Sequence, residues 1–548
     1  MSETTTADLV FTGGPVHTGS PARTRATTVA VRGERVVAVG HDEVRELIGP
    51  RTEVVDLAGR LLVPGFQDAH AHPVGGGLEM GQCDLSGATT RVEYRERITA
   101  YARTHADAEW ITGGGWAMEA FPGGLPTAAE LDDLVSDRPV YLVNRDHHGA
   151  WVNSRALERA GLDARTPDPS DGRIERHPDG TPTGMLQEGA ANLVGRLVPQ
   201  ATREERVAGL LRAQELLHSL GITAWQDALL GEHANLTDPT DAYLACAEDG
   251  TLTARVVGAL WWDRARGIEQ IEELLARRAA GTRRRLRSTT VKIMQDGVAE
   301  NGTAALLSPY LDGCGCVSDN SGISFVPPED LKTYVTELDA HGFQVHFHTL
   351  GDRAVREALD AVEAARRANG RTDTRPHLAH LQVVHPDDIG RFRELGATAN
   401  LQPLWAAHEP QMDELTIPFL GAERASWQYP FGALLRSGAT LAAGSDWPVS
   451  SPDPLQGIHV AVNRVAPDAP AGTPVFLPGE RIGLHDALTA YTAGSAYANH
   501  LDHETGTVAE GFLADLVVLD RDPFAGPPEE IGATRVEQTF VGGHRVFG

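Results

Sequence analysis

The feature that most constrains the fold of this chain is a repeated passage from an apolar helix, through one glycine, into a short apolar strand. The clearest copy is residues 203–220, which carry leucine and valine at helical spacing and lead through Gly221 into the strand 222–225. The same unit returns around Gly342, Gly396 and Gly438. Glycine directly after a helix adopts the left-handed conformation at little cost, so repeated handovers of this kind predict a parallel sheet.

The number of strand candidates narrows the architecture. Eight segments qualify: residues 61–72, 221–227, 253–260, 288–296, 343–349, 375–382, 397–403 and 439–446. Eight parallel strands with intervening helices are typical of a (β/α)8 TIM barrel, which places catalytic groups at the C-terminal ends of its strands. An open doubly wound sheet is the alternative, but Gly75-Gly76-Gly77 lacks the G-x-G-x-x-G spacing of a phosphate-binding turn.

The two ends of the chain have a different texture from the middle. Short β-branched strands are expected near residues 8–12, 28–32, 35–40 and 52–57, and again near 514–519 and 538–546. Neither set can bury a face alone, so we expect a composite β-sandwich from residues 1–62 plus 503–548. The barrel would span residues 63–502, with an inserted subdomain at about 74–199 that is too long to be a loop and overhangs the active face.

Composition indicates the class of partner. The 548 residues include 75 acidic and 48 basic side chains, a formal charge of −27, which argues against nucleic acid and anionic membrane surfaces. We therefore expect a small-molecule substrate, and a homodimer is left open. Four cysteines are too few for a disulfide framework, and Cys314-Gly315-Cys316 is interpreted as a turn with incidental thiols. No apolar stretch is long enough for a membrane span and the first residues are polar, so a cytoplasmic location is expected.

Metal-ligand residue types stand at the ends of several predicted strands. His70 and His72 lie two residues apart on the first strand and therefore project from the same face. The fifth strand ends with His346 and His348, the sixth contains His380, and the eighth ends with Asp446. Nitrogen and oxygen donors of this kind suit zinc best, with manganese, iron or nickel as alternatives.

A lysine in the fourth strand is equally informative. Lys292 and Lys332 are the only lysines among the 48 basic residues, and Lys292 lies in an otherwise apolar strand. A lysine amine with a lowered pKa reacts with carbon dioxide to give a carbamate that can bridge two metal ions, which arginine cannot do. The alternative is a buried ammonium paired with Asp296 or Asp446.

These motifs together resemble the amidohydrolase superfamily, in its amidohydrolase 3 branch, which includes N-substituted formamide deformylase. The matching stretches are residues 64–72, 291–297, 348–354, His380 and 444–448. The resemblance implies a distorted barrel with a sandwich from both termini, and metal ligands at His70, His72, Lys292, His348, His380 and Asp446. It selects His348 rather than His346 but leaves the number of zinc ions at one or two; we prefer two, because a CO2-derived carbamate on Lys292 has two oxygens to share. Thr349 and Ala379 depart from the common pattern without removing a ligand.

The expected reaction follows from this ligand set. A metal-activated hydroxide would attack a carbonyl, with Asp446 as the general base that later protonates the departing nitrogen. Candidate substrate-binding residues are Trp116, Phe121, His148, Trp151, Trp405 and Trp447, with His147, Trp261 and Trp262 as further candidates. Packing inside the insertion or the barrel is the competing explanation for the aromatic residues.

Three functions are open on the sequence. The first is hydrolysis of a non-peptide C–N bond in a small linear amide, of the N-formyl or N-acyl amine type. The second uses the same metal site on a cyclic amide, a deamination or a decarboxylation. The third is a barrel without activity, kept as a binding protein, which predicts a missing ligand, and no ligand is missing.

Overall fold

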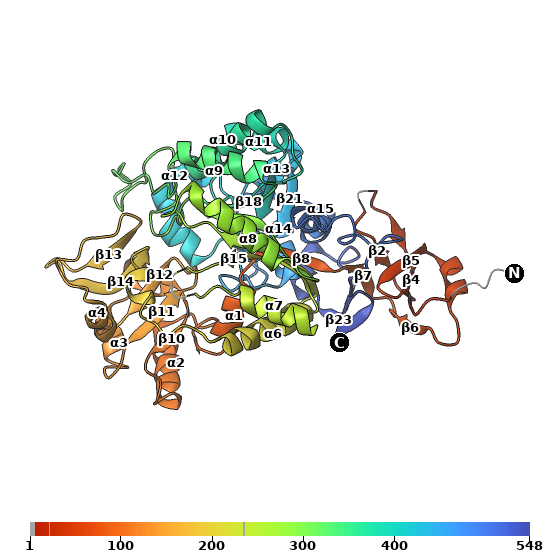
Figure 1. Ribbon diagram of the computed structural model, residues 1–548, viewed down its shortest axis with the longest axis horizontal. Helices are drawn as coiled ribbons and strands as arrows, with labels where there is room; N and C mark the ends of the chain where they lie inside the picture. The colour runs from red at the N-terminus through yellow and green to blue at the C-terminus, as the bar shows by residue number, and fades with distance from the viewer. Residues whose placement is uncertain (1–5, 21, 234–235) are drawn as a thin grey trace.

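A parallel eight-stranded barrel forms the centre of the protein (Figure 1), as seen in a computed structural model that describes residues 6–20, 22–233 and 236–548. Its strands are β8 (Phe66–Ala71), β15 (Ile222–Leu230), β16 (Arg255–Trp261), β17 (Leu286–Met294), β18 (Gln344–Thr349), β19 (His377–His380), β20 (Thr398–Leu401) and β21 (Thr440–Ala443). The first and last strands meet just beyond their ends, where the amide of Asp446 donates to the carbonyl of His70 (2.7 Å) and that of His72 to Trp447 (2.8 Å). The predicted barrel is confirmed.

Helices connect successive strands and cover the outside of the barrel. They are α6 (Arg203–Ser219), α7 (Thr240–Asp249), α8 (Ile271–Gly281), α9 (Pro328–Ala340), α10 (Asp352–Asn369), α11 (Pro386–Leu395), α12 (Ile417–Ala425) and α13 (Phe431–Ser437). After β21 come α14 (Pro454–Asn463), α15 (Leu484–Thr489) and α16 (Ser495–Ala498). Each of the four handover glycines has a positive φ, 80° at Gly221, 72° at Gly342, 70° at Gly396 and 83° at Gly438, as predicted.

The first predicted strand is wrong in one respect, because residues 61–72 form two strands. β7 (Leu61–Pro64) runs antiparallel to β22 (Leu516–Leu519) in the terminal sheet, and only β8 belongs to the barrel. The change occurs at Gly65, where a Cβ would lie 2.4 Å from the Thr223 hydroxyl oxygen, so the chain crosses between sheets at a point that accepts no side chain.

Both termini contribute to the sheets beside the barrel. One sheet has the order β24-β23-β22-β7-β2-β3, using β2 (Val16–His17), β3 (Arg25–Ala26), β23 (Val536–Val541) and β24 (His544–Phe547). The other has the order β5-β4-β1-β6, from β1 (Leu9–Thr12), β4 (Thr28–Arg32), β5 (Arg35–Gly40) and β6 (Glu53–Asp56). Phe11 and Phe540 meet edge to face between them, with ring centroids 5.0 Å apart.

The long segment after β8 begins with α1 (Pro73–Glu79) and then builds a sheet of its own. Its order is β13-β14-β12-β11-β10-β9, from β9 (Cys83–Asp84), β10 (Ile111–Trp116), β11 (Val140–Asn144), β12 (Gly149–Val152), β13 (Gly172–Arg176) and β14 (Pro182–Glu188). Helices α2 (Arg91–Thr104), α3 (Ala128–Asp132), α4 (Ser154–Ala160) and α5 (Asn192–Gly195) accompany it. Figure 1 shows this insertion at one end of the molecule and the terminal sheets at the other, with the barrel between them.

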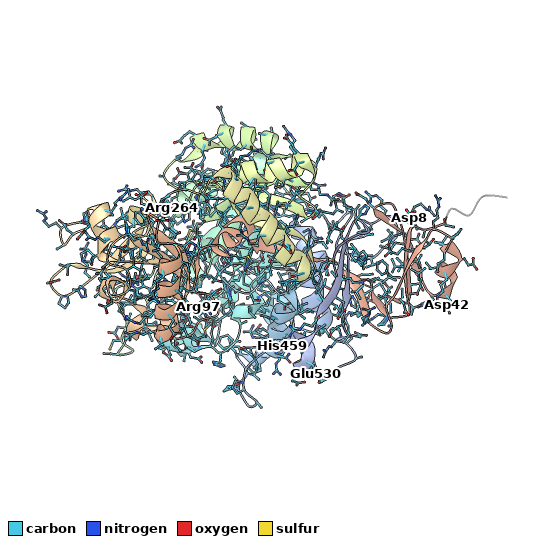
Figure 2. The ribbon with its side chains drawn as sticks, turned by 90° about the horizontal axis from the view of Figure 1, so that it is seen from below. Asp8, Asp42, Arg97, Arg264, His459 and Glu530 are labelled. Atoms are coloured by element: carbon cyan, nitrogen blue, oxygen red, sulfur yellow. The ribbon has the colours of Figure 1, made fainter. Side chains whose placement is uncertain are left out.

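The same separation is visible from a second direction. In Figure 2, Asp8, just before β1, and Asp42, after β5, lie at the right of the molecule, whereas Arg97 of the insertion lies left of its centre. Within the described ranges, no helix has the length and apolarity needed to cross a membrane.

Candidate metal centre

Three predicted ligands from the first and last barrel strands come together at one point. Asp446 Oδ1 lies 3.1 Å from His70 Nε2 and 3.0 Å from His72 Nε2. One ligand atom from each of the three residues lies within 4.8 Å of the others, an arrangement that can hold a metal ion. The barrel closure described above creates this group, because it joins the end of β8 to the turn after β21.

The remaining predicted ligands surround the same point. His348 lies on β18 and His380 ends β19, with ring centroids 4.5 Å apart, and the His380 ring is 4.8 Å from that of His70. Lys292 projects from β17, and all six predicted ligands line one cavity. The structure therefore brings the whole predicted ligand set to the C-terminal end of the barrel.

Several potential metal-ligand atoms in this group lack a hydrogen-bond partner. Among the residues that the structure describes, no hydrogen-bond partner reaches the buried atoms His72 Nδ1, His348 Nδ1, Asp446 Oδ1 and both ring nitrogens of His380. Buried polar atoms left unpaired cost about 1–3 kcal/mol each, so their concentration in one place calls for a group that satisfies them. A divalent cation fits, because its natural ligands are these imidazole nitrogens and carboxylate oxygens.

Hydrogen bonds on the far side of His70 set its tautomer. Gln226 donates through Nε2 to Gln344, so its Oε1 is an acceptor for His346 Nδ1–H at 2.7 Å. His346 Nε2 is then an acceptor for His70 Nδ1–H at 2.8 Å. This leaves the lone pair of His70 Nε2 directed toward Asp446 and the candidate metal position, so His346 orients a ligand from one layer deeper in the barrel.

Lys292 has no ion-pair partner among the described residues. Its Nζ lies 3.3 Å from His346 Nε2, and burial lowers the pKa of Lys292 to about 7 although Asp446 opposes the shift. Asp296, the other predicted partner, instead accepts backbone amides from Ala305, Leu350 and Gly351. A substantial share of the Lys292 amine is therefore neutral near pH 7, which is the nucleophilic form.

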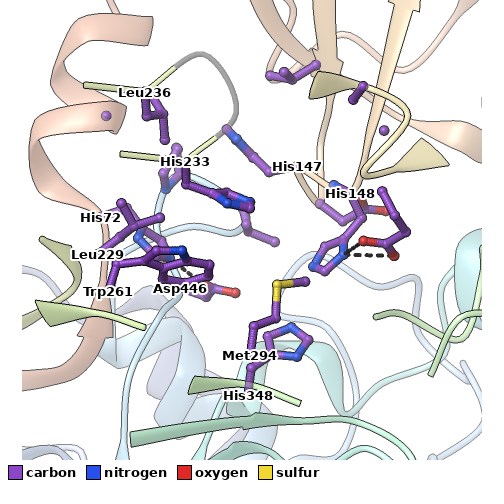
Figure 3. A pocket seen from close by; sticks show the side chains of 18 of the residues that line it. His72, His147, His148, Leu229, His233, Leu236, Trp261, Met294, His348 and Asp446 are labelled. Carbon is purple, nitrogen blue, oxygen red and sulfur yellow. Dashed lines mark hydrogen bonds and ion pairs between the residues drawn. The ribbon is translucent and has the colours of Figure 1, made fainter. Parts of the chain in front are cut away.

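The cavity in front of the ligands has a volume of about 130 Å³ and is roofed by the insertion. Figure 3 shows His148 beside Met294 and His348, whereas His147 lies nearer His233. His148 Nδ1 lies 2.9 Å from Glu188 Oε2, and Thr303 Oγ1 donates to Glu188 Oε1 at 2.6 Å. Burial disfavours the charged imidazole, but the Glu188 carboxylate outweighs it and raises the pKa of His148 to about 9. His148 thus carries a positive charge beside the ligands.

Most of the aromatic residues predicted to line the substrate pocket lie away from the cavity. Trp116, Phe121 and Trp151 are buried together inside the insertion, with ring centroids 5.1 to 5.9 Å apart, and the structure does not bring them to the cavity. They fill the small core that a sheet of this size needs. Trp261 does line the cavity, whereas Trp262 packs on Tyr334 in the barrel core.

The other two predicted tryptophans, Trp405 and Trp447, differ in what they contact. Trp405 stacks on His380, with centroids 5.3 Å apart, and lines a neighbouring cavity. Trp447 covers Gly76, where a Cβ would lie 2.7 Å from its ring, so it seals α1 rather than facing the substrate. Glu188 was not predicted, since no local spacing relates it to its partner His148, 40 positions away.

Comparison with known proteins agrees with this geometry. A family model described as "Amidohydrolase family" matches residues 53–547, which is nearly the whole chain. The chain belongs to the amidohydrolase family. This amidohydrolase is 33% identical to the Protein LONG AFTER FAR-RED 3 of Arabidopsis thaliana, over 99% of this chain and 92% of that protein. It is 29% identical to the N-substituted formamide deformylase of Arthrobacter pascens, over 98% of this chain and 97% of the enzyme.

A solved structure extends the likeness to three dimensions. An uncharacterized metal-dependent hydrolase from Pyrococcus horikoshii superposes with a TM-score of 0.73 at 26% identity, covering 95% of this amidohydrolase and 99% of the other chain. The protein is a metal-dependent hydrolase that acts on carbon–nitrogen bonds other than peptide bonds.

Proposed function

We propose that this amidohydrolase hydrolyses the C–N bond of a small linear amide, of the N-formyl or N-acyl amine type. The observation that carries the proposal is the convergence of unpaired ligand atoms from four strand ends on a cavity of about 130 Å³. The apolar wall of that cavity, formed by Val143, Leu229, Leu236, Trp261 and Met294, suits an apolar substituent. Similarity to a formamide deformylase along nearly the whole chain supports a linear amide.

We infer that zinc is held by His70, His72, His348, His380, Asp446 and a CO2-derived carbamate on Lys292. When bound, such an ion supplies Lewis acidity toward the amide carbonyl and acidifies water. The lowered pKa of Lys292 and the absence of a carboxylate partner for it among the described residues both favour carbamate formation.

The protein's own residues then move the proton. Asp446 Oδ1 lies 3.1 Å from His70 Nε2 and 3.0 Å from His72 Nε2, and a cation bound among these ligands would keep the carboxylate ionised. Asp446 Oδ2 takes a proton from the attacking water as the C–O bond forms, and returns it to the nitrogen as the C–N bond breaks. His148, fixed by Glu188 through Nδ1, leaves Nε2–H available to a developing negative charge on the carbonyl oxygen.

The test combines metal analysis with Asp446→Asn. The purified protein should hold one to two equivalents of zinc or a similar divalent ion and should hydrolyse a formamide or acyl amide within a panel that includes cyclic imides and aromatic carboxylates. Asp446→Asn keeps the shape of the side chain but accepts no proton, so kcat should fall about a hundredfold or more while the fold is kept. Asp42→Asn, at an exposed carboxylate of the short 3-10 helix Asp42–Leu47 after β5, is the control and should change nothing.

Two results would overturn the proposal. Less than half an equivalent of metal, with no gain in activity on adding metal, would remove the metal centre. Turnover confined to cyclic, deamination or decarboxylation substrates would move the protein to another reaction of the same site.

A further inference from the structure

A second chamber opens on the other side of the candidate metal centre. It has a volume of about 260 Å³ and lies between the insertion, the segment after β17 and the segment after β20. His148, His348, His380 and Asp446 line both this chamber and the first cavity. The candidate metal centre thus borders both chambers, which gives space for two substituents of a molecule bound there.

The walls of the second chamber differ from those of the first. Glu300, Glu409 and Gln382 supply oxygen atoms, and Trp405 and Tyr429 supply aromatic faces. Acceptor oxygens beside aromatic rings are the usual surroundings of an organic cation.

Arg145, the arginine of this wall, is already neutralised. Arg145 Nη2 lies 3.4 Å from Glu119 Oε1 and 3.7 Å from Glu409 Oε2, and it donates a hydrogen bond to Gln411 Oε1. Arg145 therefore has little positive charge left for an anionic ligand, and it balances the negative charge of Glu409.

Asp146 and Glu300 have no ion pair among the described residues, and Asp146 already accepts the backbone amide of His148, so Glu300 and Gln382 remain as candidates. Glu300 accepts a hydrogen bond from Thr416 but has no ion pair among the described residues, and burial raises the pKa of Glu300. Gln382 is 2% exposed and its Oε1 has no hydrogen-bond partner in the described part of the chain, since its amide nitrogen is directed to Gln428. A buried acceptor without a donor and a carboxylate without a cation face one chamber, so a donor group with a positive charge would satisfy both.

We propose that the second chamber binds an ammonium or guanidinium group of the substrate, with Glu300 and Gln382 as its recognising residues and Trp405 and Tyr429 beside them. The inference rests on the proposed function, since it takes the scissile amide to lie at the metal centre. The substrate is then an amide with an apolar portion on one side of the scissile bond and a cationic portion on the other.

Two formamides of equal length test whether the second chamber recognises a positive charge. N-(4-aminobutyl)formamide carries a terminal ammonium, and N-pentylformamide replaces it with a methyl group. The metal-loaded protein should show a kcat/KM at least about tenfold higher for the ammonium compound, the discrimination expected from about 1.4 kcal/mol of binding energy. Glu300→Gln, which keeps the shape and removes the charge, should abolish most of this preference, measured as the ratio of kcat/KM for the two formamides.

Glu414→Gln is the matched control, because Glu414 is exposed on the neighbouring turn and does not line the chamber. It makes the same change in net charge and should keep the preference. Gln382→Met, of similar volume, should also reduce the preference by removing the acceptor. Equal kcat/KM for the two formamides in the unmodified protein, or an unchanged preference in Glu300→Gln, would overturn the proposal.

Binding measurements separate this inference from the proposed function. If no amide is hydrolysed, calorimetric titration with benzylammonium and with benzyl alcohol still tests the chamber. Tighter binding of benzylammonium, lost in Glu300→Gln and kept in Glu414→Gln, supports the cation site even if the reaction is another one. Equal binding of the two compounds overturns it whatever the reaction.

Discussion

Lys292 is the single residue whose chemistry separates two interpretations of the metal centre. No carboxylate among the described residues forms an ion pair with it, and a guanidinium cannot form a carbamate. Lys292→Arg should therefore lose bound metal and activity despite keeping a basic side chain, and Lys292→Ala should regain part of its activity with added short-chain carboxylates. Lys332→Arg is the matched control, because Lys332 is solvent-facing on α9 and pairs with Glu329. Metal content and kcat are measured for the Lys292 variants and for the control. A fully metallated, active Lys292→Arg variant would contradict the carbamate.

For the individual elements, the glycines that end helices before strands fix where each barrel strand begins. At the end of α11 the amide of Ala397 donates to the carbonyl of Phe392 at 2.9 Å, and Gly396 has φ 70° with open space within 4 Å of the point where a Cβ would stand. Gly396→Ala therefore adds no clash, and its expected loss of about 1 kcal/mol in the free energy of unfolding comes from the left-handed backbone alone. Gly479→Ala, equally open but without positive φ, should cost nothing. Urea titration compares the two; equal midpoints would contradict the argument.

At the scale of the whole molecule, one buried ion pair joins the barrel to the terminal sheets. Arg255 of β16 donates to both oxygens of Asp515, at 2.7 and 3.0 Å, and Asp515 also accepts the amide of Gly542. Arg255→Met leaves this carboxylate buried without its cation, so the free energy of unfolding should fall by about 3 kcal/mol or more. Arg23→Met removes an exposed partner of Asp486 and should change it by less than about 1 kcal/mol. A loss for Arg255→Met no greater than that for Arg23→Met would show that the pair does not hold the two parts together.

The barrel and the meeting point of its candidate ligands were predictable because both follow from local rules. Helix periodicity and the glycines at 221, 342, 396 and 438 mark each strand, and the two-residue period of a strand puts His70 and His72 on one face. Parallel strands in a barrel share one C-terminal end, so ligand types at several strand ends must meet. The sequence alone therefore determined the architecture and the meeting of candidate ligands at one end of the barrel, while the choice of His348 over His346 rested on the resemblance to the amidohydrolase superfamily.

Only the tertiary structure decided what surrounds those ligands. Whether Trp116 and Trp151 face a substrate or each other depends on how the insertion folds over itself, and they prove to be its core. The pairing of His148 with Glu188, and the second chamber with Glu300 and Gln382, join segments far apart in the chain. No spacing in the sequence encodes such contacts, because they arise when separately folded elements are packed together, and packing depends on shape rather than on local pattern.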